Sequence, residues 1–182
     1  MERKKNAFSY MISLFLNWYK EENKIENIQV CYSAFSKLSL LKLLFLGAAI
    51  KTEEGTDLLD IFNNFSALPY GPVESDVYNS IIDDSIPQYT VGDRLIQIKE
   101  NDPVIIEESL KSRIEKSVNT LRKTNPNLIN ASAFQLVEIT HKWKSWTDAY
   151  SFAEFLGQRG YIMSIDEIKS DTNQYFGVQV KS

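Results

Sequence analysis

The chain has 182 residues, and its 20 Lys and Arg against 24 Asp and Glu give a formal net charge of −4. This acidic balance offers no positive surface for a phosphate backbone, so a nucleic acid is not expected as the main partner. The length fits one domain that folds without a disulfide or a metal. Cys31 is the only cysteine, which excludes an internal disulfide and favours a reducing cytoplasm.

The first stretch of the chain, MERKKNAFSYMISLFLNWYK, places basic residues before an apolar run, as a signal peptide does. Ser9, Ser13 and Asn17 interrupt that run, however, and no small-residue cleavage site follows it. The pattern instead predicts a packed N-terminal helix, because the large apolar residues repeat at helical spacing along one face: Phe8, Met11, Ile12, Phe15, Leu16 and Tyr19.

A second apolar run, LSLLKLLFLGAAI, covers 38–50 and contains Lys42. A membrane-spanning helix needs about 20 apolar residues, so this shorter run predicts a buried core helix, and no membrane contact is expected. Ser36 is a suitable N-cap for this helix. A third helix is predicted after it from apolar residues at positions i, i+3, i+4 and i+7: Leu58, Ile61, Phe62 and Phe65.

The stretch LPYGPVESDVY, at 68–78, predicts a sharp turn that starts a short helix. Gly71 tolerates the dihedral angles of such a turn, and Pro72 suits the first position of a helix. Glu74 and Asp76 would place acidic groups near the positive end of this helix, which we expect to end near Asp83.

Between 88 and 99 the apolar residues alternate, which predicts a small β-hairpin. An amphipathic helix is expected to follow, capped by Asp102, opened by Pro103 and ended by Asn125. Three further helices are predicted: one opened by the capping box of Ser132 and Gln135, one over 148–156, and one opened by the pair Ser164 and Glu167.

His141 is the only histidine, and Asp148 follows it within one or two helical turns. The pair would allow a catalytic dyad in which the carboxylate orients the imidazole as a general base. We favour a structural histidine near a helix end, because no nucleophile accompanies the pair. We therefore expect no catalytic residues and no enzymatic activity.

Metal and cofactor sites are not expected, since the chain has one His and one Cys and lacks the spacings H-x-x-x-H and C-x-x-C. Trp143 and Trp146 flank lysines in HKWKSW, an arrangement that can stack nucleic-acid bases. Two lysines are too few for a binding groove on an acidic protein. We predict that Trp146 packs in the core and that Trp143 is partly exposed.

Three stretches, in this order, resemble one family. LLKLLFLGAA at 40–49 resembles the opening helix L-x-K-L-L-Y-F-A, and ALPYGPVESDVY at 67–78 resembles the block A-W-x-Y-G-P-V-x-x-x-V-Y. LVEITHKWKSWTDAY at 136–150 resembles the block L-x-x-x-T-H-x-x-x-x-W. The family is the Panacea domain, the SocA-like antitoxins of bacterial and phage toxin–antitoxin systems. Leu68 and Phe45 depart from it, at positions where the family has tryptophan and tyrosine.

The helical patterns and this resemblance together imply a mainly α, compact helical domain with a minor β-hairpin or irregular β element. We expect the Panacea-like antitoxin domain to cover 33–182, and 1–32 to form an added N-terminal helical extension that packs on the core. Phe35 to Ser170 carry the resemblance.

The resemblance implies a cytoplasmic type II antitoxin that neutralises a cognate protein toxin by direct binding. Two alternatives stay open: a proteolytic adaptor that delivers a toxin to an ATP-dependent protease, and a phage-associated interaction protein without enzymatic activity. The expected partner is a protein toxin encoded by the adjacent gene. An ATP-dependent protease and a second copy of the chain, as a homodimer, are further candidates.

The resemblance also places the family's motif on residues of this chain, as structural or partner-binding positions: Tyr70, Gly71, Pro72, Val73, Tyr78, Thr140, His141 and Trp146. Tyr70 and Trp143 are the candidate anchors for a partner, because each is a large side chain beside a turn or helix end and belongs to no apolar stripe.

Overall fold

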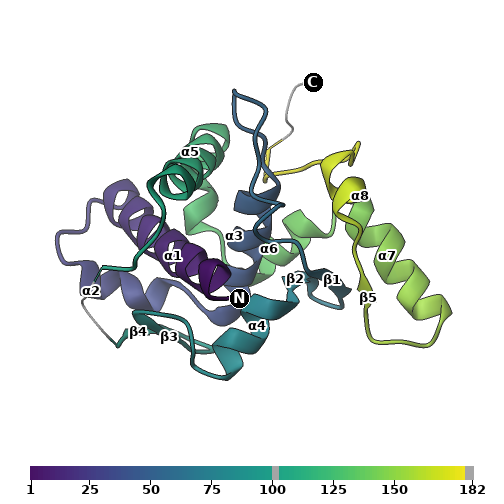
Figure 1. Ribbon diagram of the computed structural model, residues 1–182, viewed down its shortest axis with the longest axis horizontal. Coiled ribbons are helices and arrows are strands. Elements are labelled where there is room, and N and C mark those ends of the chain that lie inside the picture. Colours follow the sequence, from purple (N-terminus) through teal and green to yellow (C-terminus); the bar gives the residue numbers. More distant parts are fainter. Residues whose placement is uncertain (100–102, 179–182) are drawn as a thin grey trace.

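The computed structural model describes residues 1–99 and 103–178 of the protein. Within them the chain is mainly helical, as predicted, and carries two small sheets (Figure 1). The helices are α1 (Glu2–Glu22), α2 (Ile28–Cys31), η1 (Tyr32–Ala34), α3 (Lys37–Ala49), α4 (Ser75–Ile82), α5 (Glu108–Thr124), η2 (Pro126–Asn130), α6 (Ala133–Thr140), α7 (Lys144–Phe155) and α8 (Ile165–Lys169). The strands are β1 (Phe65–Leu68), β2 (Gly71–Glu74), β3 (Tyr89–Val91), β4 (Ile96–Ile98) and β5 (Tyr161–Ile162).

Helix α3 forms the centre of the core, as its predominantly apolar sequence predicts. Eleven of its residues are buried, and it contacts α1, α5, α6 and β2. Ser36 caps it, with its hydroxyl accepting from the Ser39 N–H at 3.2 Å. A helix apolar on all sides has to be covered on all sides, and this requirement places α3 inside the molecule.

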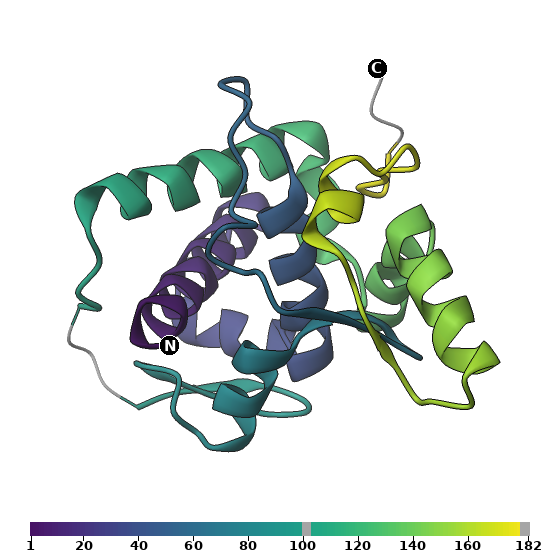
Figure 2. The same ribbon diagram turned by 45° about the vertical axis from the view of Figure 1, so that its right-hand side comes forward.

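Helices α1 and α5 lie side by side over one face of α3 (Figures 1 and 2). Their predicted apolar stripes face the core, and Phe8, Phe15 and Ile114 are completely buried. Gly47 of α3 permits the close approach, because a Cβ at this position would lie 2.9 Å from Cε of Met11. The predicted start of α5 is wrong: the helix begins at Glu108, and Asp102 lies outside the described residues.

The helix predicted from Leu58 to Phe65 is absent. All four residues of its apolar stripe are buried, but the segment forms turns, and Phe65 begins β1. Helical bonding stops after one turn, because the Asn64 N–H donates to the Glu74 carboxylate at 3.1 Å and the Asn64 carbonyl accepts from the Ser75 N–H at 2.8 Å. These distant polar partners prevail over the apolar spacing.

Pro72 does not open a helix either. It lies in β2, which pairs with β1 in an antiparallel hairpin with Leu68 opposite Gly71. The three-stranded sheet has the order β2-β1-β5, so Pro72 lies in an edge strand that needs no N–H on its outer side. Helix α4 begins three residues later than the proline, at Ser75, and it ends at Ile82, as predicted near Asp83.

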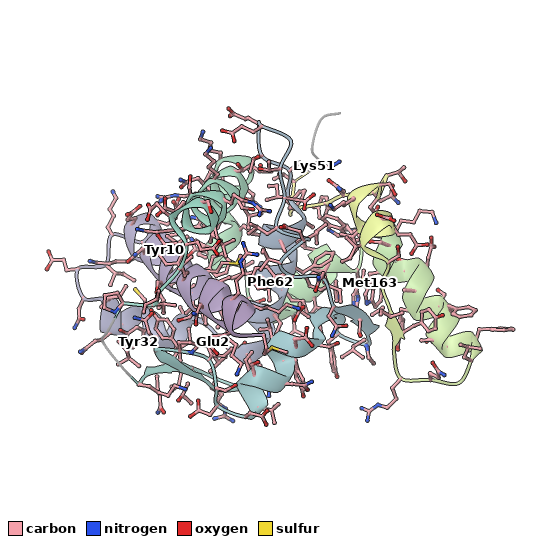
Figure 3. The ribbon with its side chains drawn as sticks, viewed as in Figure 1. Glu2, Tyr10, Tyr32, Lys51, Phe62 and Met163 are labelled. Atoms are coloured by element: carbon pink, nitrogen blue, oxygen red, sulfur yellow. The ribbon has the colours of Figure 1, made fainter. Side chains whose placement is uncertain are left out.

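The predicted hairpin between 88 and 99 is confirmed as the antiparallel pair β3 and β4, with Tyr89 opposite Ile98. The capping box of Ser132 and Gln135 opens α6 as predicted. Helix α7 starts at Lys144, four residues before its predicted start, and Ser164 caps α8. Phe62 and Met163, which Figure 3 labels, are both buried.

Glu74 joins three parts of the fold through one buried carboxylate. The Val77 N–H of α4 donates to it at 2.8 Å, the Asn64 N–H donates from the preceding loop, and Lys4 Nζ of α1 donates at 2.6 Å. Lys4 also lies 2.6 Å from the Asp76 carboxylate, and this hydrogen bond lowers the pKa of Asp76. Helix α1 is thereby tied to α4 by charge as well as by apolar packing.

Among the described residues, no single helix is long and apolar enough to cross a membrane; only Ile28–Ala34 together with α3 meets the length and composition requirements, and this pair is bent by 94°.

We expect Lys4→Met to lower the free energy of unfolding by about 3–5 kcal/mol, because it leaves the buried Glu74 carboxylate without its counter-charge. Lys5→Met, next to it on α1 and without an ion pair among the described residues, is the matched control. Urea unfolding at neutral pH measures both variants. Equal stability of the two would show that the Lys4 ion pair contributes nothing.

Candidate functional site

The three stretches that carry the family resemblance meet at one corner of the molecule. Lys42 comes from the middle of α3, Gly71 and Pro72 from β2, and Thr140 and His141 from the end of α6. Helix α3 contacts both β2 and α6, so segments up to about a hundred positions apart along the chain share one site. We call these five residues the corner site.

Lys42 is the unusual member of the corner site, because it is a completely buried cation in an apolar helix. Its Nζ donates a hydrogen bond to the Pro72 carbonyl oxygen at 2.6 Å. No carboxylate in 1–99 or 103–178 forms an ion pair with it. Burial disfavours the charged form and lowers the pKa of Lys42 from 10.5 to about 7.

Gly71 allows the hairpin to approach α3 and α6. Its φ is +94°, a conformation that side chains rarely adopt. A Cβ at this position would lie 2.6 Å from the Thr140 hydroxyl oxygen and 3.3 Å from Lys42 Nζ. The glycine is therefore required twice, once for the backbone conformation and once for the space.

His141 extends the corner site toward α7. Its imidazole stacks on the Trp146 ring, with centroids 3.8 Å apart and planes at 11°. Burial and the nearby charge of Lys42 lower the pKa of His141. The dyad with Asp148 does not form in this structure, because the Asp148 carboxylate pairs with Lys144 one helical turn away. His141 Nε2 is buried and has no hydrogen-bond partner in the described part of the chain.

The two tryptophans form hydrogen bonds to the backbone of neighbouring segments. Trp146 Nε1 donates to the Leu68 carbonyl at 3.1 Å, and Trp146 is buried as predicted. The prediction that Trp143 is partly exposed and anchors a partner is wrong: the side chain is completely buried, and its Nε1 donates to the Tyr175 carbonyl at 2.8 Å. Trp143 packs edge-on against Phe45, so it belongs to the core.

Tyr70, the other candidate anchor, is available to a partner. It occupies the tip of the β1–β2 hairpin and is 62% exposed. Beside it lies a pocket of about 450 Å³, with Lys42 and Val73 in its wall and Tyr78 at its edge. The corner site is thus buried around Lys42, and the exposed Tyr70 and this pocket lie next to it.

A second exposed surface lies on α7 and β5, at the side of the molecule opposite to α1 and α5 (Figures 1 and 2). Phe152 contacts both Phe155 and Tyr161, with ring centroids 6.4 Å and 4.8 Å apart. We name this the α7–β5 patch and define it by its exposed apolar residues: Phe152, Phe155, Leu156, Tyr161 and Ile162. Strand β5 pairs with β1, so the two β5 residues of the patch belong to the same sheet as the Tyr70 hairpin.

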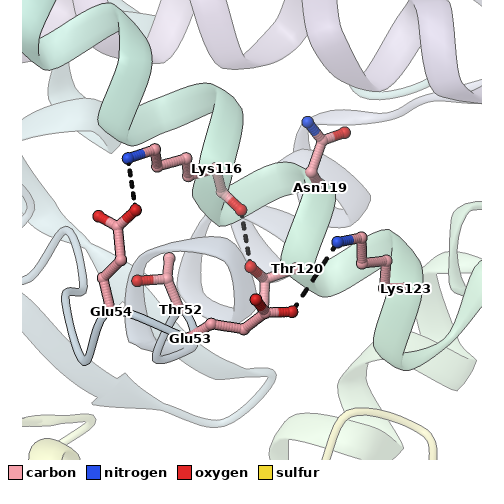
Figure 4. A pocket seen from close by; sticks show the side chains of 7 residues that line it. All are labelled: Thr52, Glu53, Glu54, Lys116, Asn119, Thr120 and Lys123. Carbon is pink, nitrogen blue, oxygen red and sulfur yellow. Dashed lines mark hydrogen bonds and ion pairs between the residues drawn. The ribbon is translucent and has the colours of Figure 1, made fainter.

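A polar hollow between α5 and the loop after α3 is a weaker candidate for a binding site (Figure 4). Its charged residues are already paired, Lys116 with Glu54 at 2.7 Å and Lys123 with Glu53 at 3.9 Å. Within the part of the chain that the structure describes, no three His, Cys, Asp or Glu side chains gather as a metal site would require.

A family comparison identifies the class of protein. The chain matches the family described as antitoxin SocA-like, Panacea domain, over residues 40–147, which is more than half of its length. It therefore belongs to this antitoxin-like family, and the resemblance seen in the three stretches is confirmed. No curated protein and no solved structure matches the chain. The division into 1–32 and 33–182 stays a prediction.

Sequence reasoning placed Gly71, Thr140 and His141 among the functional positions but missed the role of Lys42 in the site. The signal was present, since Lys42 is the only charged residue in a stretch of apolar residues. Arg159, which also lines the pocket, could not be found in this way, because only the fold brings it beside α3.

We expect Gly71→Ala to be much more destabilising than Gly55→Ala. Both glycines have positive φ, +94° and +77°, but nothing lies within 4 Å of a Cβ at Gly55. The control measures backbone strain alone, about 1–2 kcal/mol, and Gly71→Ala should add about 1–3 kcal/mol of overpacking. Equal losses in urea unfolding would contradict the close packing at Gly71.

Lys42→Met should change how stability depends on pH. Folded Lys42 loses its proton near pH 7, whereas the unfolded chain keeps it up to about pH 10.5. The unfolded state binds more protons between these values, so the wild type gains stability with rising pH, by up to about 1.4 kcal/mol per pH unit. The variant should lose this gain and be more stable than the wild type at pH 7.

The measurement for Lys42→Met is denaturant unfolding at pH 7, 8 and 9. Lys51→Met, at an exposed position, controls for the loss of one surface charge. Parallel stability curves for the wild type and Lys42→Met would show that Lys42 keeps an ordinary pKa.

Proposed function

We propose that this protein is the antitoxin of a type II toxin–antitoxin system and that it neutralises a protein toxin by binding it directly, in the cytoplasm. Membership of the SocA-like antitoxin family carries the proposal. Family membership implies binding to a partner protein, and the identity of that partner as a toxin encoded by the adjacent gene is part of what we propose.

The exposed apolar residues support direct binding. Phe155 is 84% exposed and Ile162 is 62% exposed, although both are large apolar side chains. Exposed aromatic clusters of this kind mark protein interaction sites, where a few buried aromatic anchors supply most of the affinity. We assign the toxin-binding surface to the α7–β5 patch together with Tyr70.

The position of the patch in the chain suggests that the family-matched region and the residues after it have different roles. The family match ends at residue 147, whereas the patch residues all follow it. The matched region contains the corner site, which fixes the sheet, and the patch is displayed on that sheet through β5. We infer that the shared region supplies the frame and that residues after 147 select the particular toxin.

The experiment expresses the adjacent gene in a bacterial host with and without this protein. Direct neutralisation is stoichiometric, so protection should follow the ratio of the two proteins. A harmless neighbour, or toxicity that excess antitoxin does not relieve, would refute the proposal for this gene pair. Rescue by substoichiometric amounts would favour the protease-adaptor alternative instead.

Patch variants then locate the binding surface. Phe155→Ala and Tyr70→Ala should each weaken the complex by about 2 kcal/mol or more, roughly thirtyfold in Kd, without lowering the melting temperature. Ile105→Ala is the matched control, because Ile105 is also exposed but lies outside the patch. Calorimetric titration of the toxin measures all three, and equal effects at Phe155 and Ile105 would remove the patch from the interface.

A further inference from the structure

The pocket beside Tyr70 has the size and shape of a small-ligand site. Its volume of about 450 Å³ falls in the range of ligand pockets, roughly 300–1,000 Å³. It lies where α3, the β1–β2 hairpin, α4 and the loop before β5 come together. Apolar side chains form most of its wall, among them Leu38, Leu41 and Val73.

The charged groups of this pocket are predominantly positive. Lys42 lies in the wall, and Lys37 and Arg159 line the pocket. Its one acidic residue, Asp93, is already paired with Lys37 at 2.7 Å. Within 1–99 and 103–178, Arg159 has no ion pair or hydrogen bond from its guanidinium.

The unused hydrogen-bond donors of Lys42 are a second reason to expect that the pocket binds an anion. An ammonium has three N–H donors, and a single hydrogen bond, to the Pro72 carbonyl, is formed inside the described structure. A buried cation without a counter-charge is costly, and an opposite charge a few ångströms away offsets that cost. An anion in the pocket would be held at short range by a charge that water screens poorly.

We propose that this pocket binds a carboxylate attached to an apolar or aromatic group. Arg159 binds the carboxylate from the rim through paired N–H donors, the geometry for which a guanidinium is suited. In its protonated form Lys42 attracts the carboxylate through the wall. The apolar part of the ligand packs against Leu38, Leu41 and Val73.

Two kinds of ligand carry such a carboxylate: a small organic acid and the C-terminal residue of a peptide. The probes for the first are 3-phenylpropanoate and its uncharged isostere 3-phenylpropanamide. The probes for the second are a tetrapeptide ending in phenylalanine, as the free acid and as the C-terminal amide. Calorimetric titration measures their affinities for the full chain, and methyl NMR of leucine and valine locates the bound probe.

We expect at least one free acid to bind about tenfold or more tightly than its amide, since the acid makes charge-assisted hydrogen bonds. Binding should shift the methyl signals of Leu38, Leu41 and Val73. The acid that binds more tightly identifies the source. Equal affinity of acids and amides, binding by neither, or shifts confined to other methyl groups would overturn the proposal.

Charge variants test the same site independently of the toxin. Arg159→Gln, at an exposed position, should weaken acid binding about tenfold and leave amide binding unchanged. Lys42→Met should weaken acid binding in the same direction. Lys51→Gln removes a positive charge from an exposed residue that does not line the pocket, and it should have no effect. If Lys51→Gln weakens binding as much as Arg159→Gln, net charge alone explains the affinity and the proposed site is refuted.

Discussion

The hydrogen bond from Lys42 to the Pro72 carbonyl is the constraint on which the corner of this fold depends. A lysine in the middle of the core helix has to bring its amine to an acceptor, because an unpaired buried donor would be costly. The acceptor is a strand carbonyl, which fixes the distance between α3 and β2. At that distance only a glycine fits at position 71, next to the Thr140 hydroxyl.

From this corner the arrangement of the exposed elements follows. Strand β2 pairs with β1, and β1 pairs with β5, so the position of the hairpin sets that of the last strand. Trp146 adds a second link by donating to the Leu68 carbonyl at the end of β1. The buried amine, the hairpin and β5 are therefore connected by a short series of hydrogen bonds. The exposed residues with which we propose that the protein binds its partner are therefore positioned by a lysine that is itself completely buried.

The sequence predicted the elements whose apolar residues face one shared core, and it failed where long-range polar contacts decide the structure. Helix α3 follows from its continuous apolar run, and the β3–β4 hairpin follows from the local alternation of apolar residues. The segment from Leu58 to Phe65 has helical spacing, yet the backbone N–H of Asn64 donates to the carboxylate of Glu74, ten positions further along the chain. Trp143 was misplaced for the same kind of reason, since its acceptor, Tyr175, lies more than thirty residues further along the chain.

The pairing of α1 with α5 has a consequence for how the chain is made. The two helices are joined by contacts such as the hydrogen bond between Tyr10 and Glu115, which are 105 positions apart. At ribosomal speeds of roughly 5–20 residues per second, α1 leaves the ribosome about 5–20 s before α5 exists to cover it. During that interval α1 can pack against α2, α3 and α4, but the surface that α5 covers stays exposed to chaperones and proteases for seconds. The core of this protein is therefore complete only after α5 has been made, when about two thirds of the chain has been synthesised.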